Sequence, residues 1–139
     1  MLRPLFAIAM TLAAAAGKHT PPRETLRAFH LPSGNIGCAA DDMSGQWELR
    51  CDINERNWRG PSQPRSCDLD YGDALGMSGA GRPYWVCHGD TALGQGPVLG
   101  YGQSWRAGPF TCLSQLAGLT CSNRTGHGFF LSRASYRVF

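Results

Sequence analysis

Six cysteines constrain the fold of this 139-residue chain more than any other feature of its sequence. An even number of cysteines in a short chain is typical of an extracellular disulfide framework, which compensates for a small hydrophobic core. Zinc sites usually contain close pairs such as C-x-x-C, whereas eight residues separate even Cys112 from Cys121. We therefore expect disulfides and no metal site among the cysteines Cys38, Cys51, Cys67, Cys87, Cys112 and Cys121.

The pairing of the cysteines is open, because six cysteines allow fifteen connectivities. Local sequence nevertheless favours pairing in sequential order. The segments IGCAADDMSGQWELRCDI and PFTCLSQLAGLTCSN each place two cysteines in arms of alternating apolar residues around a turn-like sequence. Opposed residues of a β-hairpin lie close enough to form a disulfide. The favoured pairs, the third by elimination, are Cys38–Cys51, Cys112–Cys121 and Cys67–Cys87.

The first residues have the pattern of a secretory signal peptide. MLRPLFAIAMTLAAAAGK carries a charged Arg3, continues as an apolar run and ends in alanines at an A-x-A-like site. The apolar run is shorter than the about 20 residues that a transmembrane helix needs. We expect residues 1–16 to be a signal peptide, residues 17–25 to be a flexible lead-in, and the protein to be periplasmic or secreted, without stable membrane insertion.

Short alternating segments predict an all-β fold. QWELRCDI alternates Trp47, Leu49 and Cys51 with polar residues, as a half-buried strand does. Similar short runs follow, and glycine-containing turns separate them. No stretch has the spacing of a long amphipathic helix, and only the tail RASYRVF is expected to form one helical turn. Residues 26–139 are therefore predicted to be a single disulfide-bridged β domain, a small sandwich or barrel of short strands with little helix.

The loop ERNWRGPSQPR is the best candidate for a binding surface. Its Trp58 is surrounded by three arginines, Arg56, Arg59 and Arg65. An aromatic ring with nearby guanidinium groups suits anionic or sugar-bearing polymers. The alternative is that Trp58 folds inward and fills the core beneath a long loop, while the arginines only keep the loop soluble.

The stretch CSNRTGHGFFLSR places His127 between two glycines. A general base needs an orienting partner, and Asp90 and Ser132 would complete a Ser-His-Asp arrangement. The chain lacks the G-x-S-x-G motif of a nucleophile elbow, however. The flanking glycines also allow a sharp turn that other residues do not. We favour a structural His127 over one that contacts a ligand, and either of these over catalysis.

Two groups of polar residues faintly resemble metal sites. His88 and Asp90, in CHGDT, would share one face of a strand, but a third ligand, His127 or His30, would have to come from elsewhere, and nothing in the sequence fixes that geometry. DLDYGDAL places Asp68, Asp70 and Asp73 close together, but glycines occupy the positions of the further oxygen ligands of an EF-hand. We assign a metal to neither group.

The order of several motifs resembles a known family. FHLPSGNIGC, CDLDYGDAL, CHGDT, VLGYG and GLTCSNRTGHGFFLSR follow one another between Phe29 and Phe139. They look like a family of small, exported, cysteine-rich bacterial proteins, best represented in actinobacteria and classed only as a domain of unknown function. The resemblance implies an exported, cysteine-bridged domain with no established activity, and it supplies no catalytic residues.

These observations predict an exported, non-catalytic binding or structural module of the bacterial envelope or secretome, without a cofactor. The formal net charge of +3 is too small to predict a nucleic-acid partner. The expected partner is an envelope polymer or another exported protein. Two alternatives stay open: a small hydrolase that uses His127 with Asp90 or Ser132, and an inhibitor or interaction protein that acts through the loop 54–66.

Overall fold

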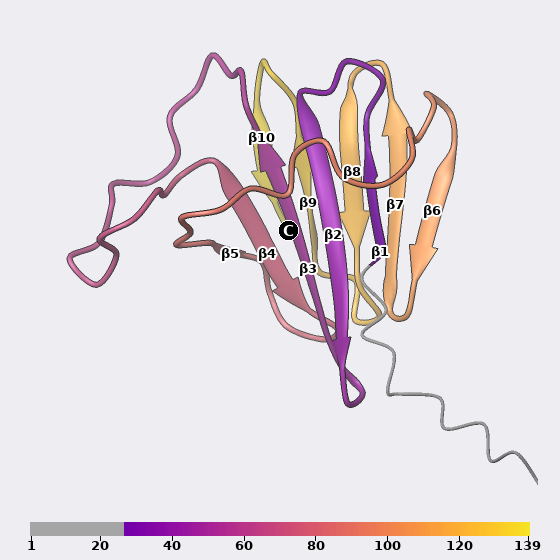
Figure 1. Ribbon diagram of the computed structural model, residues 1–139, viewed down its shortest axis with the longest axis horizontal. Helices are drawn as coiled ribbons and strands as arrows, with labels where there is room; N and C mark the ends of the chain where they lie inside the picture. The colour runs from indigo at the N-terminus through magenta and orange to yellow at the C-terminus, as the bar shows by residue number, and fades with distance from the viewer. Residues whose placement is uncertain (1–26) are drawn as a thin grey trace, which may run out of the picture.

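The computed structural model describes residues 27–139, so the expected signal peptide and lead-in lie outside the described residues. Residues 27–139 contain ten strands in two antiparallel sheets and no helix (Figure 1). Accordingly, nothing in this part of the chain is a helix long and apolar enough to cross a membrane. The two sheets share one buried core, which confirms the all-β prediction and selects the sandwich over the barrel.

Each sheet is a meander, in which strands that follow one another in the chain also pair. The first sheet has the order β1-β2-β3-β4-β5, with β1 (Arg27–His30), β2 (Ile36–Met43), β3 (Gln46–Ile53), β4 (Ala74–Ser78) and β5 (Tyr84–Trp85). The second sheet has the order β10-β9-β8-β7-β6, with β6 (Ser104–Ala107), β7 (Phe110–Gln115), β8 (Gly118–Ser122), β9 (Gly128–Leu131) and β10 (Tyr136–Val138).

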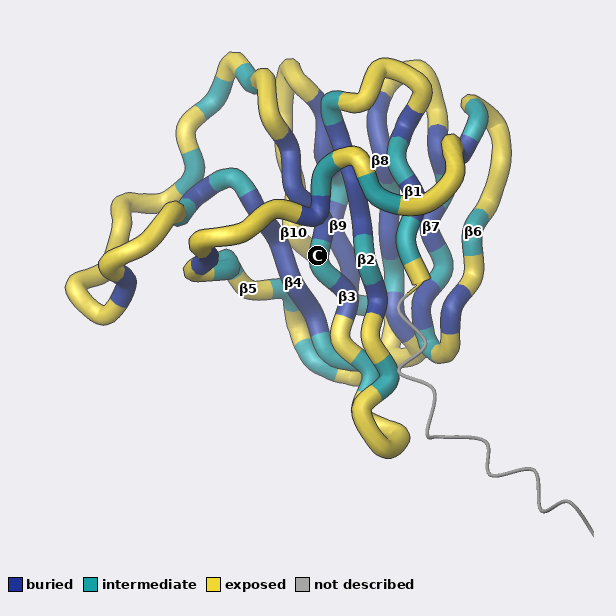
Figure 2. Tube along the Cα trace, in the orientation of Figure 1, coloured by how far each residue is buried: buried dark blue, intermediate teal, exposed yellow. Residues whose placement is uncertain are grey.

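The core lies between the two sheets and follows from the alternation along the strands (Figure 2). On β3, Leu49 and Cys51 are buried, and Trp47 packs at the rim of the core. From the second sheet, Phe110 and Phe129 face them and are fully buried. Aromatic and branched side chains on alternate positions thus supply most of the apolar area that the fold removes from water.

Two disulfides bridge directly opposed residues of neighbouring strands, one between β2 and β3 and one between β7 and β8. The third joins the long loop after β3 to the segment after β5. The bridges are those that the sequential pattern favours, namely Cys38–Cys51, Cys112–Cys121 and Cys67–Cys87. The sulfur atoms of Cys38, Cys51 and Cys121 lie within 4.8 Å of one another. The bridges of the two sheets therefore meet in the middle of the core.

The meanders place the connecting loops at two opposite ends of the sandwich. One end, here called the loop end, lies at the top of Figure 1 and carries the segments 31–35, 100–103, 116–117 and 132–135 and the beginning of the long segment 54–73. The other end, here called the hairpin end, carries the tighter connections 44–45, 79–83, 108–109 and 123–127.

The tail RASYRVF forms β10 and not a helical turn, so that prediction is wrong. β10 pairs with β9, and Phe139 exchanges two backbone hydrogen bonds of 2.9 Å with Gly128. A Cβ atom at Gly128 would lie 2.1 Å from the carbonyl oxygen of Cys121 and 2.9 Å from the Phe139 ring. The tail forms a strand because it pairs with the free backbone N–H and C=O groups at the edge of β9. The sequence of the tail alone does not indicate this pairing.

Candidate functional site

The loop end contains a cavity of about 460 Å³ between loops of both sheets. Its lining includes the buried Leu31 and Ile36. Polar side chains supply much of the remaining surface. The exposed side chains of Tyr101 and Leu116 also line the cavity. The cavity therefore combines a small apolar base with many hydrogen-bonding groups.

A second cavity, of about 500 Å³, adjoins the first. Both are lined by Asn54, Glu55 and Arg133, and the second also by Arg56 and Trp58. Because the cavities share these three residues, they lie side by side, and we call the two together the loop-end groove.

Hydrogen bonds within the first sheet hold one wall of the loop-end groove. The side-chain oxygen of Asn35 accepts the backbone N–H of Glu55 at 2.6 Å, and its amide nitrogen donates to the carbonyl of Glu55 at 2.9 Å. The backbone N–H of Asn54 also donates to the Asn35 carbonyl at 2.9 Å. The Asn35 amide thus fixes where the loop begins after β3.

Contacts between the sheets hold the other part of the groove. The backbone N–H of Asn57 donates to the Arg133 carbonyl at 2.8 Å, and the Trp58 indole N–H donates to the Ser132 carbonyl at 2.8 Å. An ion pair joins Glu55 to Arg133. The loop 54–58 of the first sheet is therefore attached to the turn that follows β9 in the second.

Of the predicted binding residues, the structure brings Arg56 and Trp58 together in the groove. The Arg56 guanidinium lies 5.5 Å from the centroid of the Trp58 ring. Arg59 and Arg65 are exposed and line neither cavity of the groove. Action of the loop 54–66 on a partner protein stays a prediction.

Trp58 itself is half-buried, and it packs inward as the alternative interpretation holds. Its ring centroid lies 4.6 Å from that of Tyr136 and 6.1 Å from that of Trp85. These three rings lie where the edge strands β5 and β10 of the two sheets approach each other. Trp58 is therefore a wall of the groove and not a freely presented platform.

His127 lies at the hairpin end, far from the loop-end groove. Its carbonyl accepts the backbone N–H of Asn123 at 2.9 Å, which closes the turn between β8 and β9. The Asn123 side chain donates to the carbonyls of Ser78 at 3.1 Å and Gly81 at 2.7 Å, and Thr125 donates to that of Ala80. These bonds attach the turn to the first sheet.

The three residues of the hydrolase alternative are not brought together. His127 precedes β9 and Ser132 follows it, which separates them by roughly 16 Å of extended chain. The Ser132 hydroxyl donates to the Ser135 carbonyl at 3.0 Å, and the Asp90 carboxylate pairs with Arg50 in the other sheet. No proton transfer from Ser132 to His127 is possible in this arrangement.

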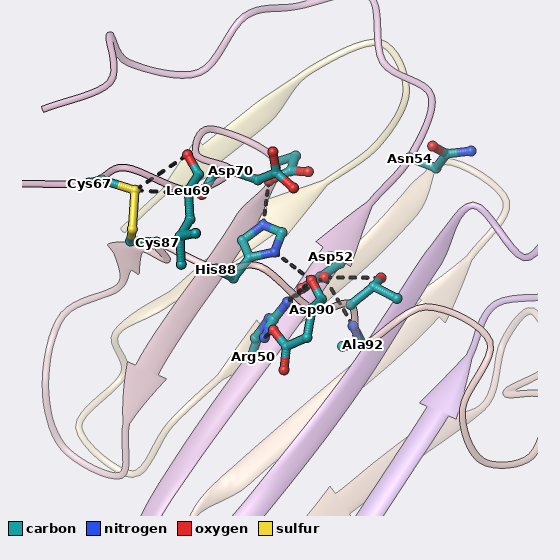
Figure 3. A network of polar contacts seen from close by, with 12 residues as sticks. Arg50, Asp52, Asn54, Cys67, Leu69, Asp70, Cys87, His88, Asp90 and Ala92 are labelled. Atoms are coloured by element: carbon teal, nitrogen blue, oxygen red, sulfur yellow. Dashed lines mark hydrogen bonds and ion pairs between the residues drawn. A yellow bond between two sulfur atoms is a disulfide. The ribbon is translucent and has the colours of Figure 1, made fainter.

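A network of polar contacts covers the outer face of the first sheet (Figure 3). Arg50 on β3 donates to both carboxylate oxygens of Asp52, at 2.7 and 2.8 Å, and to Asp90 at 2.7 Å. Asp52 is only 2% exposed, because the segment after β5 crosses over it and Ala92 donates its N–H to the carboxylate at 3.0 Å. The network fixes that segment to the sheet.

His88 is held at both ring nitrogens, which the metal interpretation had left available. Nδ1 lies 2.6 Å from the Asp90 carbonyl and Nε2 lies 2.7 Å from an Asp73 carboxylate oxygen. Both partners are acceptors, so the two contacts are both hydrogen bonds when the imidazole is protonated. Burial and the charge of Arg50 lower the pKa of His88, but the bonds to Asp73 and Asp90 raise it more, and the net shift is upward.

A further cavity, of about 380 Å³, borders this network, but several of its polar groups already pair with one another. Besides the contacts of Arg50, the Tyr84 hydroxyl donates to Glu48 at 2.8 Å. Burial and that carboxylate raise the pKa of Tyr84 to about 12, so the phenol remains a donor at neutral pH. The loop-end groove is the better candidate site.

Sequence reasoning missed most of the groove, because its residues come from loops far apart in the chain. Only Arg56 and Trp58 formed a recognisable local pattern. The Arg50–Asp52 pair did have a signal, since residues two apart on a strand face the same side.

Comparison with known proteins finds one match. The model of a family of unknown function (DUF6636) matches residues 4–139 of the chain. No curated protein and no solved structure matches the chain significantly. The family match covers nearly the whole chain and assigns no activity to the groove.

Proposed function

The chain belongs to the family of unknown function DUF6636, and we propose that it is an exported, non-catalytic binding module whose loop-end groove holds a segment of a polar polymer. The observation that carries this proposal is that two neighbouring cavities, of about 460 and 500 Å³, share the lining residues Asn54, Glu55 and Arg133.

The chemistry of the groove suits a chain of sugar units. Asn54 and Arg133 offer side-chain donors, and the carboxylate of Glu55 is an acceptor, so vicinal hydroxyl groups find both kinds of partner. The exposed ring of Tyr101 offers a flat surface for the apolar face of a sugar ring. We therefore propose a carbohydrate of the bacterial envelope as the ligand class.

The disulfides support the proposed compartment. The structure forms three disulfides, and such bridges persist in oxidising environments outside the cytoplasm. Together with the signal-peptide pattern of residues 1–16, they support a periplasmic or secreted protein. Envelope polymers are present in that compartment.

The acidic residues that line the groove support binding without catalysis. Hydrolysis of a glycosidic bond ordinarily uses two carboxylic groups on either side of the bond. Among the described residues that line the two cavities, Glu55 is the one acidic residue, and it pairs with Arg133. The groove is therefore suited to hold a polysaccharide and not to cleave it.

Isothermal titration calorimetry of the oxidised protein tests this proposal. The probes are short oligosaccharides, a neutral glucan and an acidic galacturonan. We expect saturable binding to at least one of them, weakened about fivefold by Asn54→Ala, since a lost hydrogen bond contributes about 1 kcal/mol. The matched control is Gln46→Ala, an exposed residue of β3 near the hairpin end. Equal weakening by both variants, or binding to neither probe, would contradict the proposal.

A further inference from the structure

Arg56 contains a polar atom that the structure leaves without a partner. Its Nε is buried, and the Nε–H donates to no hydrogen-bond acceptor within the described residues. The guanidinium makes one hydrogen bond, of 3.3 Å from Nη1 to the Asn54 carbonyl. A guanidinium has five N–H donors, so Arg56 uses few of them.

An unpaired buried donor on a charged group is costly, and folded proteins rarely retain one without a reason. The Trp58 ring, 5.5 Å from the guanidinium carbon, interacts with the positive charge. A ring face does not supply an in-plane acceptor for Nε, however. Arg56 lines the cavity and has N–H donors for which the described residues supply no acceptor, so an oxyanion in the cavity would supply one.

The charge around this cavity also favours an anion. Of the residues that line the 500 Å³ cavity, Arg56 and Arg133 are positive and only Glu55 is negative. The side chains of Arg133 and Glu55 are 58% and 62% exposed, so their ion pair is weak and exchangeable. A negative group on a ligand can therefore compete with Glu55 for Arg133 and neutralise the remaining charge.

We propose that this half of the loop-end groove binds an oxyanion carried by the polymer, a carboxylate or a phosphate diester, with Arg56 and Arg133 as the binding residues. The proposal rests on the proposed function and narrows its ligand class to acidic polymers. A carboxylate matches the planar fork of a guanidinium through two parallel hydrogen bonds. A small rotation of the Arg56 guanidinium toward the cavity would give Nε the acceptor that it lacks.

The experiment compares three short probes by calorimetry on the oxidised protein. They are a galacturonan oligomer, its fully methyl-esterified form, which keeps the sugar chain and loses the charge, and a glycerol phosphate oligomer. We expect the acidic galacturonan to bind at least tenfold more tightly than the ester, and the difference to shrink at high salt. Tighter binding of the glycerol phosphate oligomer would identify phosphate and not carboxylate as the source.

Matched variants assign the effect to Arg56. Arg56→Met keeps the aliphatic stem over Trp58 and removes the charge, so it is expected to abolish the preference for the acid over the ester. Arg59→Met removes a charge from the same loop outside the cavity and is expected to leave the preference unchanged. Arg56→Met is also expected to unfold no earlier than the unmodified protein, because it removes the unpaired Nε.

The outcomes separate the two proposals. Equal binding of acid and ester would overturn the anion inference and leave the proposed function standing. A preference for the acid that survives Arg56→Met would overturn the assignment to Arg56. If none of the three probes binds, the proposed function fails along with the inference.

Discussion

Asp52 shows how a residue that looks exposed in the sequence becomes buried. It follows Cys51 on β3, so its side chain faces the outer side of the first sheet, where a carboxylate normally meets water. The segment after β5 covers this side, and Asp52 is 2% exposed. Arg50, Thr91 and Ala92 supply its hydrogen bonds, which offset the cost of removing the carboxylate from water.

The first prediction concerns this buried carboxylate. Asp52→Asn removes the negative charge beside Arg50 and replaces one of the two acceptor oxygens by an NH2 donor, so we expect the free energy of unfolding to fall by roughly 3 kcal/mol. Asp90→Asn is the control, because the Asp90 side chain is 80% exposed, and its effect is expected to be much smaller. Urea denaturation at neutral pH measures both. Equal losses for the two variants would show that Asp52 does not hold the network together.

His88 gives a prediction for pH. Its pKa in the folded protein is raised above 6.5, the value for the unfolded chain. At pH values below the pKa of the unfolded chain, such a group makes its full contribution to the free energy of unfolding. That contribution is lost as the pH rises through the pKa of the group in the folded protein. The difference in free energy of unfolding between the protein and His88→Gln should therefore shrink as the pH rises from about 6.5. A difference that stays constant, or grows, would contradict the contacts to Asp73 and Asp90.

At the scale of elements, the loop 54–73 decides whether the groove exists. The loop belongs to the first sheet, yet its hydrogen bonds from Asn57 and Trp58 reach the turn after β9 in the second. The rings of Trp58, Trp85 and Tyr136 fill the space beneath it. The groove is thus made by attachment of one loop across the sandwich.

Trp58 tests this attachment. Trp58→Ala removes the ring from the aromatic cluster, and we expect it to destabilise the protein by about 3 kcal/mol. Trp58→Phe keeps a ring and loses the hydrogen bond to Ser132, so its cost should be nearer to 1 kcal/mol. Thermal unfolding followed by near-ultraviolet circular dichroism measures both. If Trp58→Ala unfolds like the unmodified protein, Trp58 is a free surface platform and not a wall of the groove.

At the scale of the whole molecule, the bridges differ in how accessible they are. Cys38–Cys51 and Cys112–Cys121 lie in the core and are 0% exposed, whereas Cys87 lies in an exposed segment after β5. Each bridge stabilises the fold by about 3 kcal/mol in the chain-entropy model. The two core bridges connect strands within each sheet and do not cross between sheets.

This difference predicts the order of reduction. Under native conditions a dithiol should reduce Cys67–Cys87 first, because a thiolate must reach a sulfur atom to attack it. The two core bridges should resist until the protein unfolds. Alkylation of the freed thiols followed by peptide mass mapping gives the order. Early reduction of a core bridge would mean that the sandwich opens more readily than its packing indicates.

The sequence predicted those parts of the fold that local patterns determine. Alternation around Leu49 and Cys51 indicated a half-buried strand, and the opposed cysteines follow from a hairpin. The tail was misread because β9, and not the tail itself, supplies the partner of β10. The groove was not predictable for a similar reason, because Asn54, Tyr101 and Arg133 are far apart in the sequence and line one cavity only in the folded protein.

The most direct test of the account is to map where an acidic oligosaccharide binds. Amide chemical shifts of the isotope-labelled protein, titrated with a galacturonan oligomer, report binding residue by residue. We predict that the shifted amides gather at the loop end, in the segments 31–36, 54–58, 100–103, 115–118 and 132–133. Shifts centred on the hairpin end, in 79–83 and 123–127, or no shifts at saturating oligosaccharide, would contradict it.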